Sequence, residues 1–98
     1  MQTLTAILRA TPGHEDEVKA ALLKVGDYAR AHEPDTLGFF VAQDPDDPCV
    51  FTTYERFTDR AAMDRHNEGP GSKGFFAEAG HLLDGPATIV TAQEIFER

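Results

Sequence analysis

The order of its periodic segments constrains this chain most. Side-chain alternation predicts a strand at Gln2 to Arg9, the dense run of Phe39, Phe40 and Val41 predicts a second at Thr36 to Gln43, and alternation again predicts a third at Val50 to Phe57. Between the first two, apolar residues recur at the spacing of one helix face: Val18, Ala21, Leu22 and Val25. That helix is expected to have Thr11 as its cap and Pro12 at its first position, and to end near His32.

The second half of the chain repeats this pattern in shorter form. The turn-forming run Asp44 to Pro48 joins the second and third strands into a hairpin. Thr58 is expected to cap a short helix that carries His66. The Gly-rich stretch Glu68 to Gly74 predicts a break, Phe75 to Ala79 predicts a further helical turn, and a last strand is expected over Ala87 to Phe96.

The resulting order, β-α-β-β-α-β, predicts a ferredoxin-like α+β fold: an antiparallel four-stranded sheet with the helices on one face. We expect a single domain over residues 1–98. The other face of the sheet would be an exposed apolar surface, so a second copy of the chain is the expected cover. The sequence thus predicts a homodimer, with Ala87 to Phe96 at or near the interface.

Composition narrows the choice of partners and compartment. The formal net charge of −8, with the few Lys and Arg residues scattered, disfavours nucleic acid. The apolar run Phe39 to Ala42 is far too short to span a bilayer, so no membrane partner is expected. The single cysteine, Cys49, cannot form an internal disulfide and suits a reducing compartment. A cytoplasmic location is expected.

Two polar residues fall on faces that should point inward. Glu55 shares a strand face with Phe51 and Phe57, and a carboxylate among core residues is costly without a partner. His66 lies three residues after Met63 on the apolar stripe of its helix. The pair could form a structural contact or a catalytic one, and spacing alone favours the structural interpretation. The four histidines show no metal-binding spacing, so no metal site is predicted.

The chain also resembles the antibiotic biosynthesis monooxygenase domain family. The resemblance lies in Pro12-Gly13 after the first strand, Glu55-Arg56-Phe57 at the end of the third, and Ala61 or Ala62 with His66 on the next helix. It implies a dimeric α+β barrel that oxygenates quinols or aromatic polyketides with O2, without haem, flavin or metal. No cofactor is therefore expected.

The resemblance also implies a small-molecule pocket between the sheet and the helices of each subunit. A small residue on the first strand, Ala6, leaves room for a ligand. The residues expected to bound this pocket are Ala6, Phe51, Thr53, Phe57, Met63, His66, Phe75 and Phe76.

Two departures from the family pattern shift the expected activity. Members that oxidise polyketide anthrones have Trp where this chain has Phe57, and the haem-degrading relatives have an Asn near the position of Ala6. Haem degradation is therefore disfavoured. The segments Gln43-Asp44-Pro45 and Tyr54-Glu55-x-Phe57 resemble the sequences of the branch of this family that processes phosphorylated autoinducer-2.

Three functions remain open at the level of sequence. In the first, an oxygenase, a small quinol stacks against Phe51, Phe57 and Phe75 while Glu55 or His66 removes its proton. In the second, an isomerase, the same pair moves a proton between carbons of a small oxygenated metabolite. The third is a dimer that binds a small ligand without catalysis. Oxygen uptake separates the first from the second.

Overall fold

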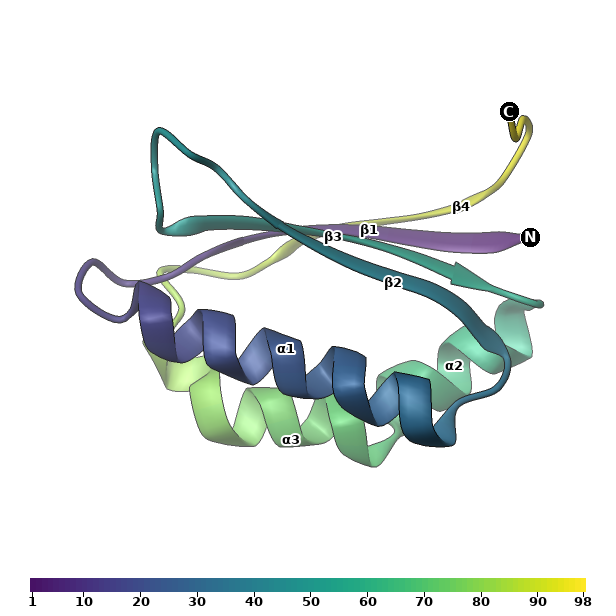
Figure 1. Cartoon of the computed structure of the whole chain (residues 1–98), viewed down its shortest axis with the longest axis horizontal. Helices are drawn as coiled ribbons and strands as arrows, with labels where there is room; N and C mark the ends of the chain where they lie inside the picture. The colour runs from purple at the N-terminus through teal and green to yellow at the C-terminus, as the bar shows by residue number, and fades with distance from the viewer.

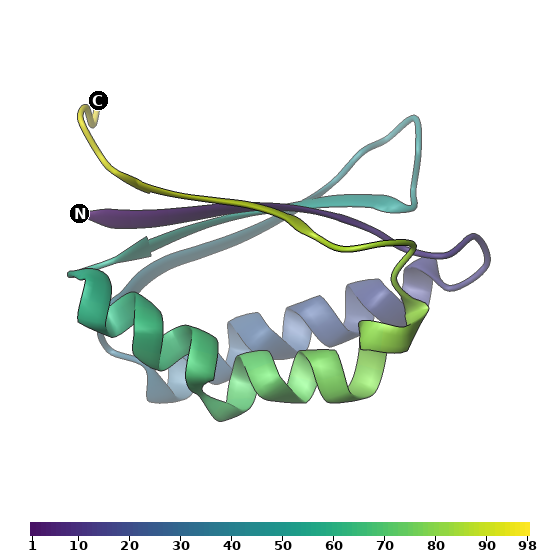
Figure 2. The same ribbon diagram turned by 180° about the vertical axis from the view of Figure 1, so that it is seen from behind.

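The computed structural model covers residues 1–98 and has the expected two-layer architecture, with one additional helix. The elements run β1 (Gln2–Arg9), α1 (Glu15–His32), β2 (Thr36–Gln43), β3 (Val50–Phe57), α2 (Arg60–Glu68), α3 (Pro70–Ala79), a 3₁₀ turn (Gly80–Leu82) and β4 (Thr88–Gln93). The strands form one antiparallel sheet in the order β2-β3-β1-β4. All three helices lie against the same face of it (Figures 1 and 2). The ferredoxin-like α+β prediction is confirmed.

The first three strands have the predicted bounds, and burial alternates along β3 and along most of β1. On β3, the side chains of Phe51, Thr53, Glu55 and Phe57 are buried beneath the helices. Antiparallel pairing places Leu4 of β1 opposite Glu55 and Ala6 opposite Thr53. The inner face of the sheet, which these residues share, therefore carries both the core and the polar side chains discussed below.

The start of α1 differs from the prediction. Thr11 does not cap the helix, which begins only at Glu15 after a turn in which Gly13 adopts a positive φ of 93°. That turn is closed by the backbone amide of His14, which donates to the carbonyl of Thr11, and Gly13 N–H donates to the Glu15 carboxylate. The predicted end at His32, just before Pro34, is confirmed.

The predicted break over Glu68 to Gly74 is wrong, because only Gly69 separates two helices. A Cβ at Gly69 would lie 2.8 Å from the carbonyl oxygen of Arg65, so this tight junction requires glycine. Pro70 then occupies the first turn of α3, where its missing N–H costs nothing. The expected turn at Phe75 to Ala79 is the second half of this ten-residue helix. At α2, the capping residue is Asp59 and not Thr58, and its carboxylate accepts from Ala62 N–H.

The last strand is shorter than expected. Ala87 to Phe96 was predicted, but β4 covers Thr88–Gln93 and pairs only with β1. Gln93 is opposite Gln2, and just beyond it the Glu94 N–H donates to the carbonyl of Met1. The C-terminal residues turn away from the helices (Figure 1). No helix is long and apolar enough to cross a membrane.

The outer face of the sheet, turned away from the helices, carries apolar side chains on all four strands. Ile7, Phe40, Tyr54 and Val90 are exposed there, Phe40 by 60% and Val90 by 58%. Two further apolar residues past β4, Ile95 and Phe96, are also exposed. The uncovered apolar surface expected from the strand pattern is therefore present.

Candidate active site

The site begins with one carboxylate on the inner face of β3. Glu55 points toward the helices because its position on the strand has the same parity as the fully buried Phe51 and Phe57. Its carboxylate is almost completely buried, with a side-chain exposure of 7%. A charged group at such a depth is costly unless neighbouring groups compensate it.

His66 reaches the carboxylate from α2. Ala62, Met63 and His66 form the buried stripe of this helix, so the imidazole is directed at the sheet. The rings of Phe57 and Phe39 pack beside it, with centroids 5.3 and 5.8 Å away. The aromatic rings pack against the imidazole, and each of its two nitrogens faces a carboxylate.

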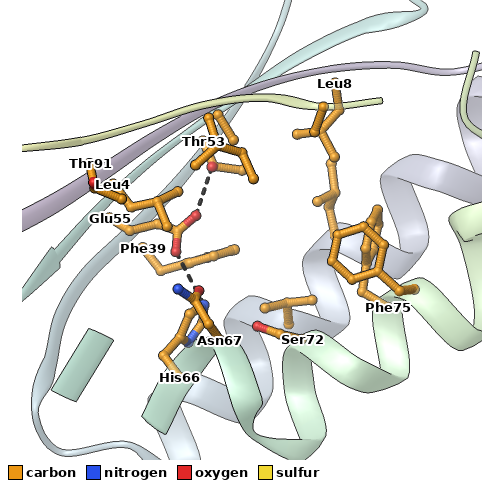
Figure 3. A pocket seen from close by; sticks show the side chains of 16 residues that line it. Leu4, Leu8, Phe39, Thr53, Glu55, His66, Asn67, Ser72, Phe75 and Thr91 are labelled. Carbon is orange, nitrogen blue, oxygen red and sulfur yellow. Dashed lines mark hydrogen bonds and ion pairs between the residues drawn. The ribbon is translucent and has the colours of Figure 1, made fainter. Parts of the chain in front are cut away.

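The Glu55 carboxylate has one satisfied oxygen and one unsatisfied oxygen. Thr53 Oγ1 donates to Glu55 Oε2 at 2.8 Å, between two residues on the same strand face. Glu55 Oε1 lies 3.1 Å from His66 Nε2, which makes an ion pair when the ring is protonated (Figure 3). However, the ring N–H does not point closely enough at Oε1 for a hydrogen bond, and Oε1 has no other partner. A buried oxygen in this state is free to accept a proton or hydrogen bond from a bound molecule.

His66 makes a second, shorter contact on its other nitrogen. Its Nδ1 lies 2.6 Å from Oε1 of Glu33, the residue just after α1, and the Thr36 hydroxyl donates to the same oxygen at 2.9 Å. Burial of the ring lowers the pKa of His66, but the contacts with Glu55 and Glu33 outweigh it and the net pKa is raised. Imidazolium is thus favoured toward neutral pH.

A cavity of about 350 Å³ lies beside this pair, between the sheet and the helices. Figure 3 shows its two ends: Thr53, Glu55 and His66 gather at one, and Leu8 and Phe75 lie at the other. Ten of its 16 lining residues are hydrophobic. The volume lies in the range of small-molecule sites, about 300 to 1,000 Å³. The cavity is therefore an apolar compartment with one acid–base pair at its end.

The structure places five of the eight residues expected around the pocket in its wall: Ala6, Thr53, His66, Phe75 and Phe76. The other three, Phe51, Phe57 and Met63, do not line it but pack in the core. Phe51 and Phe57 are fully buried because neighbouring core side chains fill the space around them. Stacking of a ligand on these two rings is therefore not supported.

Several lining residues were not anticipated from the sequence. Phe39 could have been found, because it is on the inner-face parity of β2 and opposite Glu55. Asn67 lines the cavity from α2, and Ser72 lines it from α3, within the stretch predicted to be a break. Ile89 and Thr91 of β4 complete that wall. No three His, Cys, Asp or Glu side chains are grouped so as to hold a metal ion.

Comparison with known proteins identifies the family. The model of the antibiotic biosynthesis monooxygenase family matches residues 1–78, so this chain belongs to that family. A crystal structure of an antibiotic biosynthesis monooxygenase superposes with a TM-score of 0.88 at 23% identity, covering 97% of this chain and 99% of that one. No curated protein is significantly similar to this chain in sequence.

Two solved structures from named bacteria have the same fold. PA3566 from Pseudomonas aeruginosa is 26% identical, with a TM-score of 0.86 and coverage of 97% of this chain and 94% of that chain. Rv0793 from Mycobacterium tuberculosis is 21% identical, with a TM-score of 0.88 and coverage of 98% and 96%. The family and the architecture are thus established along most of the chain.

Proposed function

We propose that this protein is a cofactor-independent monooxygenase that oxidises a small quinol or aromatic polyketide-like molecule with O2. The observation that carries the proposal is Glu55 Oε1, a buried carboxylate oxygen without a hydrogen-bond partner at the edge of an apolar cavity. Membership of the antibiotic biosynthesis monooxygenase family supports an oxygenase. The cavity supports a largely apolar substrate that carries a hydroxyl group at one end.

In the proposed reaction, Glu55 removes the proton from a substrate hydroxyl. The O–H bond breaks, Oε1 gains the proton, and the electron-rich anion passes electrons to O2. For a simple hydroquinone, one oxygen atom enters the ring and the other leaves as water, while the ring becomes a hydroxyquinone. The four electrons that O2 requires come from the substrate, so no external reductant is needed.

His66 has a different role from Glu55 in this scheme. Because the raised pKa favours its imidazolium form, the ring is a poor base and a good source of positive charge. It lies beside the carboxylate and at the polar end of the cavity, where the substrate anion would form. We therefore assign proton removal to Glu55 and stabilisation of the anion to His66.

Oxygen consumption tests the proposal directly. The purified protein is mixed with 1,4-dihydroxynaphthalene in an oxygen electrode, and the rate without protein is subtracted. We expect protein-dependent uptake that Glu55→Gln strongly reduces and that Glu17→Gln, a change of an exposed carboxylate, leaves intact. Uptake equal in wild type and Glu55→Gln would refute the assignment of the base.

The same pair also suits a second function, isomerisation of a small oxygenated metabolite. Two proton carriers 3.1 Å apart could move a proton between adjacent carbons of a hydroxyketone. That reaction uses no oxygen, so turnover in an anaerobic solution would favour it over the oxygenase. A ligand that raises the melting temperature without any turnover would instead favour a binding protein.

We also propose that the protein is a cytoplasmic homodimer. The buried, unpaired thiol of Cys49 supports a reducing compartment. The exposed Ile7, Phe40, Tyr54 and Val90 on the outer face support a second sheet as the cover, with β4 at or near the interface. Light scattering at micromolar concentration should give twice the chain mass, and Val90→Glu should shift the mass toward one chain. A monomeric wild type would refute the dimer.

A further inference from the structure

His66 separates two hollows of different character. One is the apolar cavity, and the other is a polar recess of about 230 Å³ between the end of α1 and α2, lined by Tyr28, His32, Glu33, Thr36 and Arg65 among others. His66 is the single residue that lines both. Glu55 belongs only to the cavity and Glu33 only to the recess.

The three side chains form a continuous row across this wall. Glu55 Oε1 lies 3.1 Å from His66 Nε2, and His66 Nδ1 lies 2.6 Å from Glu33 Oε1. The imidazole is 3% exposed and the Glu33 side chain 15%, so the row runs from the buried cavity toward solvent. The two nitrogens of an imidazole can lose and gain protons on opposite sides of the ring, which suits this arrangement.

We propose that Glu33 is a positioning residue that fixes the orientation of His66 and keeps its Nδ1 protonated, so that the ring stays an imidazolium facing the cavity. This inference rests on the proposed function, in which Glu55 takes a proton from the substrate. Glu33 does not line the cavity, so it acts on the reaction only through His66.

Each proton of the proposed reaction can be followed. Glu55 Oε1 takes the proton of the substrate hydroxyl, so the O–H bond breaks and Glu55 becomes neutral beside the substrate anion. His66 stays an imidazolium there, because the anion replaces the charge that Glu55 has lost and Glu33 still faces Nδ1. When the second oxygen atom leaves as water, the Nε2–H bond breaks and supplies one proton of that water, and the substrate supplies the other. Glu55 then passes its proton to Nε2, which restores both resting charges.

The surroundings of the row leave Glu33 as the group that can control His66 from the recess. Arg65 of α2 is occupied by Asp35, at 2.9 Å, and His32 at the end of α1 packs against Tyr28. On the sheet side, Glu55 of β3 is the charged group in contact with the ring. Thr36 steadies Glu33 by donating to the oxygen that faces Nδ1.

Titration of His66 by NMR tests the proposal without a substrate. We expect a midpoint above 6.5 in the wild type and, in Glu33→Gln, a midpoint at least about one pH unit lower, because one adjacent charge is lost. The matched control is Glu17→Gln, which removes the carboxylate 2.7 Å from the exposed His14 and should leave the His66 midpoint unchanged. An unchanged His66 midpoint in Glu33→Gln would overturn the proposal.

A second measurement separates control of the His66 charge from a merely structural contact. In Glu33→Ala, added formate can occupy the recess and should raise the His66 midpoint again. With 1,4-dihydroxynaphthalene, Glu33→Gln should lower kcat at least fivefold and leave KM within twofold, and formate should restore kcat in Glu33→Ala. A kcat in Glu33→Gln equal to that of the wild type would overturn the positioning role. If the wild type consumes no oxygen, the proposed oxygenase fails, whereas the formate-dependent midpoint still decides whether Glu33 governs His66.

Discussion

Two neighbouring charged residues on β3, Glu55 and Arg56, have opposite environments. Glu55 points to the inner face, where its Oε1 lacks a hydrogen-bond partner. Arg56 points to the outer face and has two carboxylate partners: its guanidinium donates twice to Glu94, at 2.9 and 2.8 Å, and once to Glu97. One peptide bond therefore separates a charge with two hydrogen-bonded partners from a buried charge that has one oxygen without a hydrogen bond.

This difference shows that the two faces of one strand can have different roles. Charges near water acquire partners at little cost, but each such pair adds little stability. A buried charge without a full set of partners reduces stability and is retained where its reactivity is useful. The predictions below test whether the inner face of β3 carries both the stability and the chemistry while the outer face carries neither.

The largest expected effect is on folding and comes from the inner face. Phe51→Ala removes a fully buried ring and should lower the free energy of unfolding by about 3 to 5 kcal/mol. Thr52→Ala, at the adjacent exposed position, should change it by less than about 0.5 kcal/mol. Urea denaturation measures both. Similar losses in the two variants would mean that the two faces are not divided in this way.

The next effect is on turnover and tests the buried Glu55–His66 pair. Glu55→Gln and His66→Ala should each lower turnover at least tenfold, equivalent to about 1.4 kcal/mol of transition-state stabilisation, while the fold survives. If the pair is only structural, the same changes should chiefly lower the melting temperature, because each leaves its partner unsatisfied. Retained turnover with lost stability would rule out the catalytic role.

Much of the fold could be predicted because alternation and burial coincide. The predicted bounds of β1 and β3, from alternation, and of β2, from its dense run of Phe and Val before a turn, agree with the structure. The first half of α3 could not be predicted, because Gly71 and Gly74 lower the local helix propensity and tertiary packing decides whether the helix forms. Gly71 lies against Tyr28 of α1, where a Cβ would be 3.0 Å from the ring. The glycine that reads as a loop residue instead permits close helix packing.

The site was predictable to the same extent. Parity on β3 and the helical stripe on α2 together placed Glu55 and His66 on facing surfaces, and the structure brings them to 3.1 Å. Glu33 was not predictable, because it follows the end of α1, where no period assigns a direction to a side chain. The prediction that Phe51 and Phe57 point inward is confirmed, but the alternation of side chains along a strand does not distinguish a cavity wall from a filled core.

A smaller effect concerns pH and the buried imidazole. A pKa raised in the folded state means that His66 contributes stability in full below pH 6.5, its ordinary value, and loses that contribution as the pH rises through the folded value. The melting temperature of the wild type should therefore exceed that of Glu33→Gln most at pH 6, and the gap should narrow toward pH 9. A gap that widens with pH would contradict the assigned direction. Glu17→Gln, at the exposed His14 pair, should show little gap at any pH.

The smallest effect is expected at the outer-face partner of Arg56. Glu94→Gln removes one of two carboxylates that contact the guanidinium and leaves Glu97 in place, so an alternative partner remains. Glu97, whose side chain is 64% exposed, and the surrounding water still stabilise the guanidinium, so the melting temperature should fall by no more than about 4 °C. Turnover should be unchanged, because Arg56 and Glu94 lie on the opposite side of the sheet from the cavity. Glu94→Gln and Glu55→Gln make the same chemical change on the two faces of the sheet. If Glu94→Gln lost as much turnover as Glu55→Gln, the reaction would depend on the sheet as a whole and not on its inner carboxylate.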